Sequence, residues 1–312
     1  MKRIGTLFLV LLLALVAFIG MAACKSPPPP PPPPVETPPP PPPPPPPPEP
    51  EPESDLPRDT DGPELSVMFS TRFFSPDGDG IDDELQVTIF VTDESPIKDW
   101  KIEIREPQPP YLLFSEWSGE GMPPEMITWG GRSASGELVQ SASEYPFKLT
   151  VSDILGNTSV YDGLIEVDIL VIREPGEILR VMVPSIVFGA NAGGFEGLDG
   201  ETMADNDRIL RRIADVLSKF DTYQVKVEGH SNPTTAPGTR ARSNEETGTR
   251  REKGLLPLSE ERAKTVVNYL VNLGVPRERL TAVGMGSSRT IIDFADKDHW
   301  WKNRRVEFIL VK

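Results

Sequence analysis

A nearly unbroken run of proline near the N-terminus limits what this chain can fold into. Residues 27–34 and 38–48 are all proline, and Glu alternates with Pro as far as Glu53. Because proline fixes φ and has no backbone N–H, this tract cannot join a helix or a sheet. It predicts a polyproline II rod that rises about 3.1 Å per residue. We expect residues 24–62 to form a semi-rigid stalk. The alternative is that the proline tract is a ligand for proline-binding domains.

The segment before the stalk has the pattern of a signal peptide. Lys2 and Arg3 precede an apolar run from Ile4 to about Met21, and the small residues Ala22 and Ala23 follow it. This order of charge, apolar run and small residues predicts a cleaved leader over residues 1–23. An uncleaved anchor that spans the membrane once is the alternative, because the run is almost long enough to cross a bilayer.

The one cysteine of the chain lies at the end of this leader. Met21-Ala22-Ala23-Cys24 resembles the bacterial lipobox, which implies cleavage before Cys24 and a lipid on its thiol. Several acyl chains would hold the protein on a membrane. Lys25 and Ser26, in place of an aspartate, favour the outer membrane under the sorting rule of some enteric bacteria. We therefore expect an outer-membrane lipoprotein that faces the periplasm.

Composition excludes several classes of function. One cysteine rules out an internal disulfide framework and a cysteine-based metal cluster, and the two histidines leave little room for a histidine-rich site. The chain has 32 Lys and Arg against 47 Asp and Glu; 21 and 18 of these lie at or after Arg180, which leaves 11 and 29 before it. Neither part is strongly basic, so we expect no nucleic-acid partner.

Residues 63–175 show short stretches of alternating apolar and polar residues, separated by turn residues. The predicted strands are 66–72, 85–91, 100–104, 147–151 and 164–170. Alternation at this spacing indicates an all-β sandwich. The segments Phe74–Asp83, Trp129–Gly131 and Val151–Asn157 resemble motifs of immunoglobulin-like modules in flagellar-hook-cap and gliding-motility proteins. That resemblance implies a spacer or an interaction module, without chemistry of its own.

Four aspartates gather on one glycine-rich loop of this region: Asp77, Asp79, Asp82 and Asp83. Carboxylate oxygens in such a cluster are the ligands that calcium prefers. The loop lacks the distal glutamate and the flanking helices of an EF-hand, and Asp-Gly pairs are common in ordinary turns. A solvated turn is our default expectation, with calcium as the alternative; we expect no other cofactor.

From residue 180 to 312 the periodicity changes to alternating strands and helices. We expect strands at 186–188, 223–228, 280–283 and 306–310, a first helix starting near Met203, and a second helix from Ser259 to Asn272. This order, β-α-β-α-β-β, predicts a compact two-layer α/β domain. The whole chain is thus predicted to be multidomain, with an all-β sandwich followed by an α/β domain.

The predicted start of the second helix carries an unusual charge. Ser259 has the character of an N-cap residue, yet Arg262 stands where a capping box would place Glu or Gln. A cation in the first turn is unfavourable because it opposes the helix dipole. Such a departure from local helix rules is expected at functional positions. Arg262 beside free N–H groups would suit a carboxylate ligand, and pairing with Glu228 or a nearby acid is the alternative.

Four successive motifs in this domain resemble the signatures of the OmpA-like peptidoglycan-binding domain: Gly229-His-Ser-Asn232, Leu258-Ser-Glu-Glu-Arg-Ala263, Gly284-Met-Gly286 and Asn303-Arg-Arg-Val-Glu307. The family implies non-covalent binding of peptidoglycan at the dibasic residue of its stem peptide. It further implies that five residues contact that ligand, namely Asn191, Asn232, Thr234, Arg262 and Arg304.

This chain departs from the family pattern at two places. Asn232 stands where the family has an aspartate, so only a neutral amide would face the ammonium of the ligand. This loss of charge predicts weaker binding, by about five- to thirtyfold. Residues 233–257 form a long loop rich in Pro, Gly and Thr, which we expect to be solvated and disordered. Alternatively, this loop could fold over the ligand site and supply new contacts, or it could block the site.

These features together predict an outer-membrane lipoprotein that binds peptidoglycan and tethers the envelope to the cell wall. The alternative is a membrane-anchored adaptor whose peptidoglycan pocket has lapsed and which binds an envelope protein. No nucleophile–base pair or phosphate-binding loop stands out, so we expect no enzymatic activity, and His230 is expected to be structural. The pair Trp300–Trp301 is expected to pack against the sheet edge rather than to stack on glycan.

Overall fold

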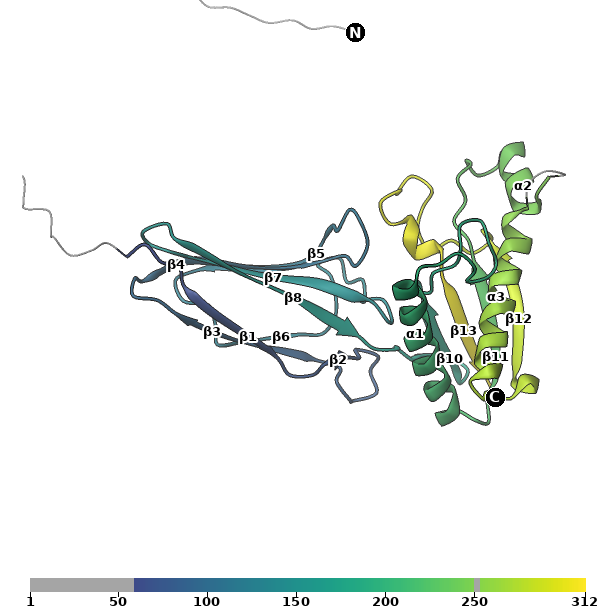
Figure 1. Cartoon of the computed structure of the whole chain (residues 1–312), viewed down its shortest axis with the longest axis horizontal. Helices are drawn as coiled ribbons and strands as arrows, with labels where there is room; N and C mark the ends of the chain where they lie inside the picture. The colour runs from purple at the N-terminus through teal and green to yellow at the C-terminus, as the bar shows by residue number, and fades with distance from the viewer. Residues whose placement is uncertain (1–58, 250–252) are drawn as a thin grey trace, which may run out of the picture. The chain divides into compact units, whose positions relative to one another are not determined.

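The computed structural model describes residues 59–249 and 253–312 (Figure 1). The predicted signal peptide, the predicted lipidation site Cys24 and the proline tract lie outside these described residues. Among the helices that are described, none combines the length and the apolar character needed to cross a membrane.

The first part of the described chain is all-β, as predicted. Its eight strands make two sheets, in the orders β1-β3-β6 and β2-β8-β7-β4-β5. The strands are β1 (Glu64–Phe69), β2 (Phe73–Phe74), β3 (Leu85–Thr92), β4 (Ile97–Arg105), β5 (Leu113–Glu120), β6 (Met126–Trp129), β7 (Glu144–Asp153) and β8 (Thr158–Val167).

One core lies between these two sheets. Along β7 every second side chain is buried, from Tyr145 through Phe147 and Leu149 to Val151. Val87 and Ile89 of β3 belong to the same buried cluster although they come from the other sheet. Alternation of this kind is expected when one face of a strand packs inward and the other meets solvent.

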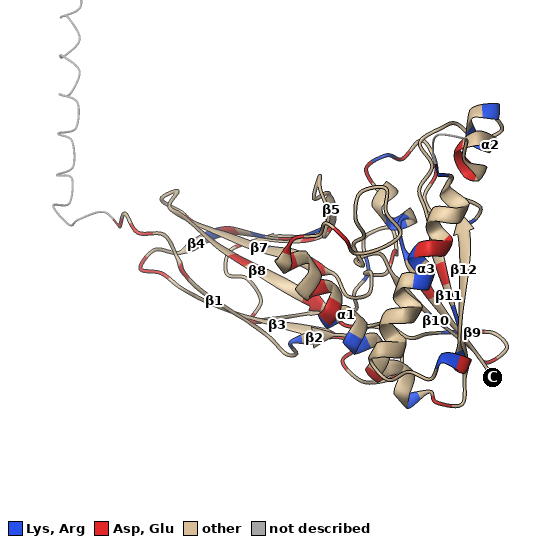
Figure 2. Ribbon diagram, turned by 45° about the vertical axis from the view of Figure 1, so that its right-hand side comes forward, with Lys and Arg blue, Asp and Glu red and all other residues tan. Residues whose placement is uncertain are grey.

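The C-terminal part is an α/β domain with the predicted order of its main elements. Its sheet has the order β12-β11-β13-β10-β9, in which only β11 and β12 run parallel. Helices α1 and α3 lie on one face of it (Figure 1 and Figure 2). The elements are β9 (Ile172–Glu174), β10 (Ile178–Val183), α1 (Gly200–Lys219), β11 (Gln224–His230), α2 (Arg240–Thr247), α3 (Leu255–Asn272), β12 (Leu280–Gly286), β13 (Val306–Val311) and the short 3₁₀ helices Arg277–Arg279 and Trp300–Asn303.

Two local predictions for this domain are wrong. Residues 186–188 are not a strand; the first central strand is β10, in which Leu179, Val181 and Val183 face the core. Helix α3 begins at Leu255, with Gly254 as its N-cap, and not at Ser259. Ser259 is fully buried, and its Oγ donates to the Leu256 carbonyl and accepts from the Gly286 N–H. Arg262 therefore lies well inside the helix, away from its free N–H groups.

Candidate functional site

A cavity of about 260 Å³, lined mainly by the C-terminal domain, gathers several basic side chains. The lining residues used below are Gln108, Ser185, Phe188, His230, Arg262, Trp301, Arg304 and Arg305. No Asp or Glu is found in the described part of this lining. Guanidinium groups have only hydrogen-bond donors, so the cavity offers a negatively charged ligand several donors and no competing acid.

Arg262 is positioned by the loop that follows β10. Its Nε donates to the Ala192 carbonyl at 3.2 Å, and its guanidinium carbon lies 5.1 Å from the centre of the Phe188 ring. Thr265, one turn further along α3, donates to the Gly193 carbonyl at 2.7 Å. Burial lowers the pKa of Arg262, and the charge of Arg304 lowers it further. An anion beside Arg262 would relieve both effects.

Arg304 and Arg305 are adjacent in the chain but have different environments. Arg304 is exposed and reaches the cavity, whereas Arg305 is buried and donates from Nε to Glu307 at 2.7 Å. Arg180 pairs with the other oxygen of Glu307. Burial alone would raise the pKa of Glu307, but the charges of Arg305 and Arg180 and the hydrogen bond from Arg305, with other neighbouring groups, together outweigh it and hold that pKa below its usual range. Arg305 thus forms a structural ion pair with Glu307. Its buried Nη1 has no hydrogen-bond partner among the described residues.

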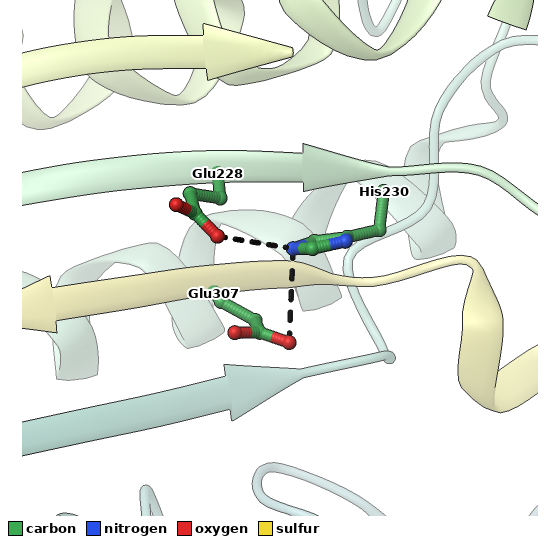
Figure 3. A group of neighbouring side chains, drawn as sticks. All are labelled: Glu228, His230 and Glu307. Carbon is green, nitrogen blue, oxygen red and sulfur yellow. Dashed lines mark ion pairs between the residues drawn. The ribbon is translucent and has the colours of Figure 1, made fainter. Parts of the chain in front are cut away.

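His230 lies at the end of β11, buried between two glutamates (Figure 3). Its Nε2 is 3.6 Å from an oxygen of Glu228 and 3.6 Å from an oxygen of Glu307. Neither ring nitrogen makes a hydrogen bond within the described part of the chain. Burial, followed by the charge of Arg305, lowers the pKa of His230 to about 4, so the ring is neutral at pH 7. The prediction of a structural histidine agrees with this burial.

The same three residues have ligand atoms close enough to hold a metal ion, within 4.8 Å of one another. Their carboxylates are already engaged. Glu228 pairs with Lys226 and Arg289, and Glu307 pairs with Arg305 and Arg180. Four cations thus surround two carboxylates and a neutral ring, and a divalent ion would add charge to a group that is already positive. We assign no metal to this cluster. The alternative pairing of Arg262 with Glu228 is not observed either.

Asn232 belongs to a buried amide network and does not line the cavity. Its Nδ2 donates to the Pro233 carbonyl at 2.8 Å, and its Oδ1 accepts from Asn303 Nδ2 at 2.8 Å. Asn303 in turn accepts from the backbone N–H groups of Ile291 and Ile292. Both ends of the Asn232 amide are therefore engaged within the protein.

The other two predicted contact residues also lie outside the lining of the cavity. Asn191 is exposed at the tip of the 189–194 loop, with a left-handed backbone at φ +53°. Thr234 donates from its backbone N and its Oγ1 to Glu245 of α2, at 2.7 Å each. Of the five predicted residues, the structure thus brings only Arg262 and Arg304 together at this cavity.

The loop over residues 233–257 is more ordered in its described part than expected. It contains α2, whose Thr239 caps the N-terminus by accepting from the Arg242 N–H. Glu246 of α2 accepts from the Ser287 backbone N–H, which ties the helix to the end of β12. The expectation of a disordered loop is therefore wrong for residues 233–249 and 253–257, because side-chain carboxylates hold α2 against the domain.

Three of the four predicted calcium ligands converge in the β part of the chain. Oxygens of Asp77, Asp79 and Asp83 lie within 4.8 Å of one another, and Asp82 is not in this group. The carboxylate of Asp83 accepts from the N–H groups of Gly78 and Gly80 at 2.6 and 2.7 Å. Such contacts are typical of an ordinary turn, which was the default expectation from the sequence. Calcium binding, the alternative, stays untested.

Sequence reasoning missed most of the cavity lining. Phe188, His230, Trp301 and Arg305 line it together with Ser185, whose Oγ is buried without a hydrogen bond among the described residues. Trp301 is buried and lines the cavity, while the packing of the Trp300–Trp301 pair against the sheet edge stays a prediction. Arg262 and Arg304 are the two residues of this lining that the sequence analysis had marked as ligand contacts.

The site described above is an arginine-lined cavity on an α/β domain. Comparison with known proteins identifies its type: the chain belongs to the OmpA family, whose sequence model matches residues 202–304. The peptidoglycan-associated lipoprotein of Pseudomonas putida is 33% identical over 133 residues, which is 40% of this chain and 76% of that protein. Proteins of this type are not enzymes, which confirms the sequence prediction.

Two further proteins are similar to part of this chain. The peptidoglycan-binding protein ArfA of Mycobacterium tuberculosis is 33% identical over 115 residues, and the chain spans 31% of its length. The cell wall anchor of the T6SS from Pseudomonas aeruginosa is 26% identical to this chain, with a TM-score of 0.34 over 45% of this chain and 86% of that one. A TM-score this low supports no further argument. The β part of the chain has no family assignment from these similarities.

Proposed function

We propose that residues 180–312 bind peptidoglycan without a covalent bond, through a carboxylate held between Arg262 and Arg304. One observation carries this proposal: both guanidinium groups line one cavity, and its described lining contains no acid. Charge-assisted hydrogen bonds from two arginines are among the strongest contacts that a protein offers to a carboxylate. Stem peptides of the cell wall carry such groups. The same ligand is supported by two relatives, one named a peptidoglycan-binding protein and the other a peptidoglycan-associated lipoprotein.

We further propose that the whole protein is an outer-membrane lipoprotein that tethers the envelope to the wall. In this view a lipid on Cys24 holds the chain on the membrane, facing the periplasm, and residues 24–62 form the stalk. Residues 63–175 then act as an immunoglobulin-like spacer between the stalk and the binding domain. The supporting features are the lipobox-like Met21–Cys24, the proline tract and the similarity to a peptidoglycan-associated lipoprotein.

A second candidate function is an adaptor that binds an envelope protein and has lost its hold on the wall. The arrangement of Asn232 favours it, because its amide is engaged by Pro233 and Asn303 and does not face the cavity. A ligand with an ammonium group would then find no partner there. The two functions differ in whether the purified protein binds isolated wall.

Co-sedimentation with purified peptidoglycan sacculi tests the proposal. The full chain in mild detergent should pellet with sacculi, and Arg262→Ala should weaken this by at least about tenfold, since it removes a charge-assisted contact. Arg208→Ala is a matched control, because Arg208 is an exposed arginine of α1 outside the cavity. A wild-type protein that stays in the supernatant would overturn wall binding and favour the adaptor.

A further inference from the structure

A fully buried lysine links the β part of the chain to the C-terminal domain. Lys302 is 1% exposed, and its Nζ donates to Glu106 Oε1 at 2.9 Å and to Glu137 Oε1 at 2.6 Å. Both glutamates belong to the β part, on loops between strands. The described residues of both parts belong to one compact unit. A lysine is almost never fully buried unless it is paired, so this cluster fixes the position of its backbone.

The backbone that carries Lys302 is also one wall of the arginine cavity. Lys302 lies in the 3₁₀ helix Trp300–Asn303, directly between the cavity residue Trp301 and the segment leading to Arg304. The Arg304 N–H donates to the Trp301 carbonyl at 3.1 Å, which closes this short helix. The ammonium of Lys302 lies 5.3 Å from the centre of the Trp301 ring. Any movement of Lys302 would therefore shift Trp301 and Arg304.

The loop that supplies Glu106 also reaches the cavity itself. It connects β4 to β5, and its conformation is held by a Glu106 N–H bond to the Leu112 carbonyl and a Tyr111 N–H bond to the Gln108 carbonyl. Gln108 lines the cavity together with Arg262 and Arg304. The β part thus contributes Gln108 to the cavity lining and two ion pairs, from Glu106 and Glu137, to the segment that holds Arg304.

We propose that Glu106 and Glu137 are positioning residues for the peptidoglycan site, acting through Lys302 to place Trp301 and Arg304. The inference rests on the proposed function of the cavity. It gives the β part a role beyond that of a spacer: binding at full affinity requires its β4–β5 loop to be seated on the C-terminal domain. Exposed ion pairs contribute little free energy and seldom hold side chains in one position. When both partners are buried, removing one of them leaves an unpaired buried charge, which costs much more free energy.

The test is a double-mutant cycle on binding of the full chain to sacculi. Glu106→Gln keeps the shape of the side chain and a hydrogen bond to Lys302 but removes the charge, while Glu137 still pairs with Lys302. We expect the concentration of sacculi at half-maximal pelleting to rise about fivefold, the equivalent of about 1 kcal/mol. In an Arg304→Ala background the same change should have a clearly smaller effect, because one of the two residues that it positions is gone.

The controls separate positioning from loss of folding. Glu116→Gln removes one partner of the exposed pair with Lys101 on the same β part and should leave binding unchanged. Glu137→Gln, at a side chain that is 37% exposed, is a second variant with less risk of unfolding and should follow Glu106→Gln. Thermal unfolding of each variant verifies that it is folded at the assay temperature.

Two results would overturn the inference while the proposed function stands. One is wild-type affinity in both Glu106→Gln and Glu137→Gln. The other is an equal loss of affinity from Glu106→Gln in the wild-type and Arg304→Ala backgrounds, since a general structural effect would not depend on Arg304. If wild-type protein does not bind sacculi, both the function and the inference fail.

Discussion

His230 is buried and has no hydrogen-bond partner among the described residues. Burial and the nearby charge of Arg305 both disfavour the protonated form of its ring. Its pKa falls from 6.5 to about 4. In the unfolded chain the ring takes up a proton near its usual pKa, whereas in the folded protein it does not. The stability that comes from neutral His230 is therefore present above pH 6.5 and is lost as the pH falls towards 4, by about 3 kcal/mol in total.

Replacing His230 with glutamine removes this titration. We expect the free energy of unfolding of His230→Gln, measured with urea at pH 7 and pH 4.5, to fall less over that interval than the free energy of the wild type. The carboxylates of the chain titrate in both proteins, so the difference between the two slopes isolates the histidine. Parallel slopes would show that His230 is not the group responsible.

At the scale of elements, α3 approaches β11 so closely that only glycine fits at one position of the strand. A Cβ built on Gly229 would lie 2.1 Å from the Ser259 carbonyl oxygen, which is backbone and cannot rotate away. Gly229→Ala would force α3 away from the sheet, and with it Arg262. We expect a loss of about 3 kcal/mol in unfolding free energy, at the upper end for overpacked cores.

Gly200→Ala is the matched control for this prediction. Gly200 begins α1, and nothing lies within 4 Å of a Cβ built on it. Its replacement should leave the thermal midpoint unchanged or slightly raised, because alanine favours the helix. Equal midpoints for the two variants would contradict the close packing of α3 on β11.

At the scale of the whole molecule, the proposed tether depends on the anchor at Cys24. Cys24→Ser removes the only thiol of the chain and, with it, the acceptor of the lipid. We expect the variant to move from the membrane fraction to the soluble periplasmic fraction, while binding of the released protein to sacculi stays the same. Continued recovery in membranes would favour the uncleaved membrane-spanning anchor instead.

Much of the C-terminal fold could be predicted from periodicity and motifs, because the pattern of apolar residues sets the order of strands and helices. The start of α3 could not be predicted in this way. Gly254 and Pro257 are residue types typical of loops, yet proline is tolerated in the first helical turn, where its missing N–H would have no helical partner. As a result, the argument that placed Arg262 beside the helix N-terminus rests on a wrong helix start, although Arg262 does line the cavity.

The candidate site was only partly predictable because its residues meet through the tertiary fold. Phe188, Arg262 and Arg304 come from three separate segments, and Gln108 comes from the β part. Lys302 pairs with Glu106 across 196 positions of the chain, and no local pattern marks either residue as buried. Asn232 was placed at the ligand from resemblance alone, whereas its contacts with Asn303 depend on how two loops pack.

The central claim is that Arg262 and Arg304 hold a carboxylate of the wall. Titration of the full chain with a soluble stem peptide, and with the same peptide after amidation of its carboxylates, tests this most directly. We predict binding of the free acid, at least about tenfold weaker binding of the amide, and loss of this discrimination in Arg262→Ala. Equal affinity for the two peptides in wild-type protein would contradict the account.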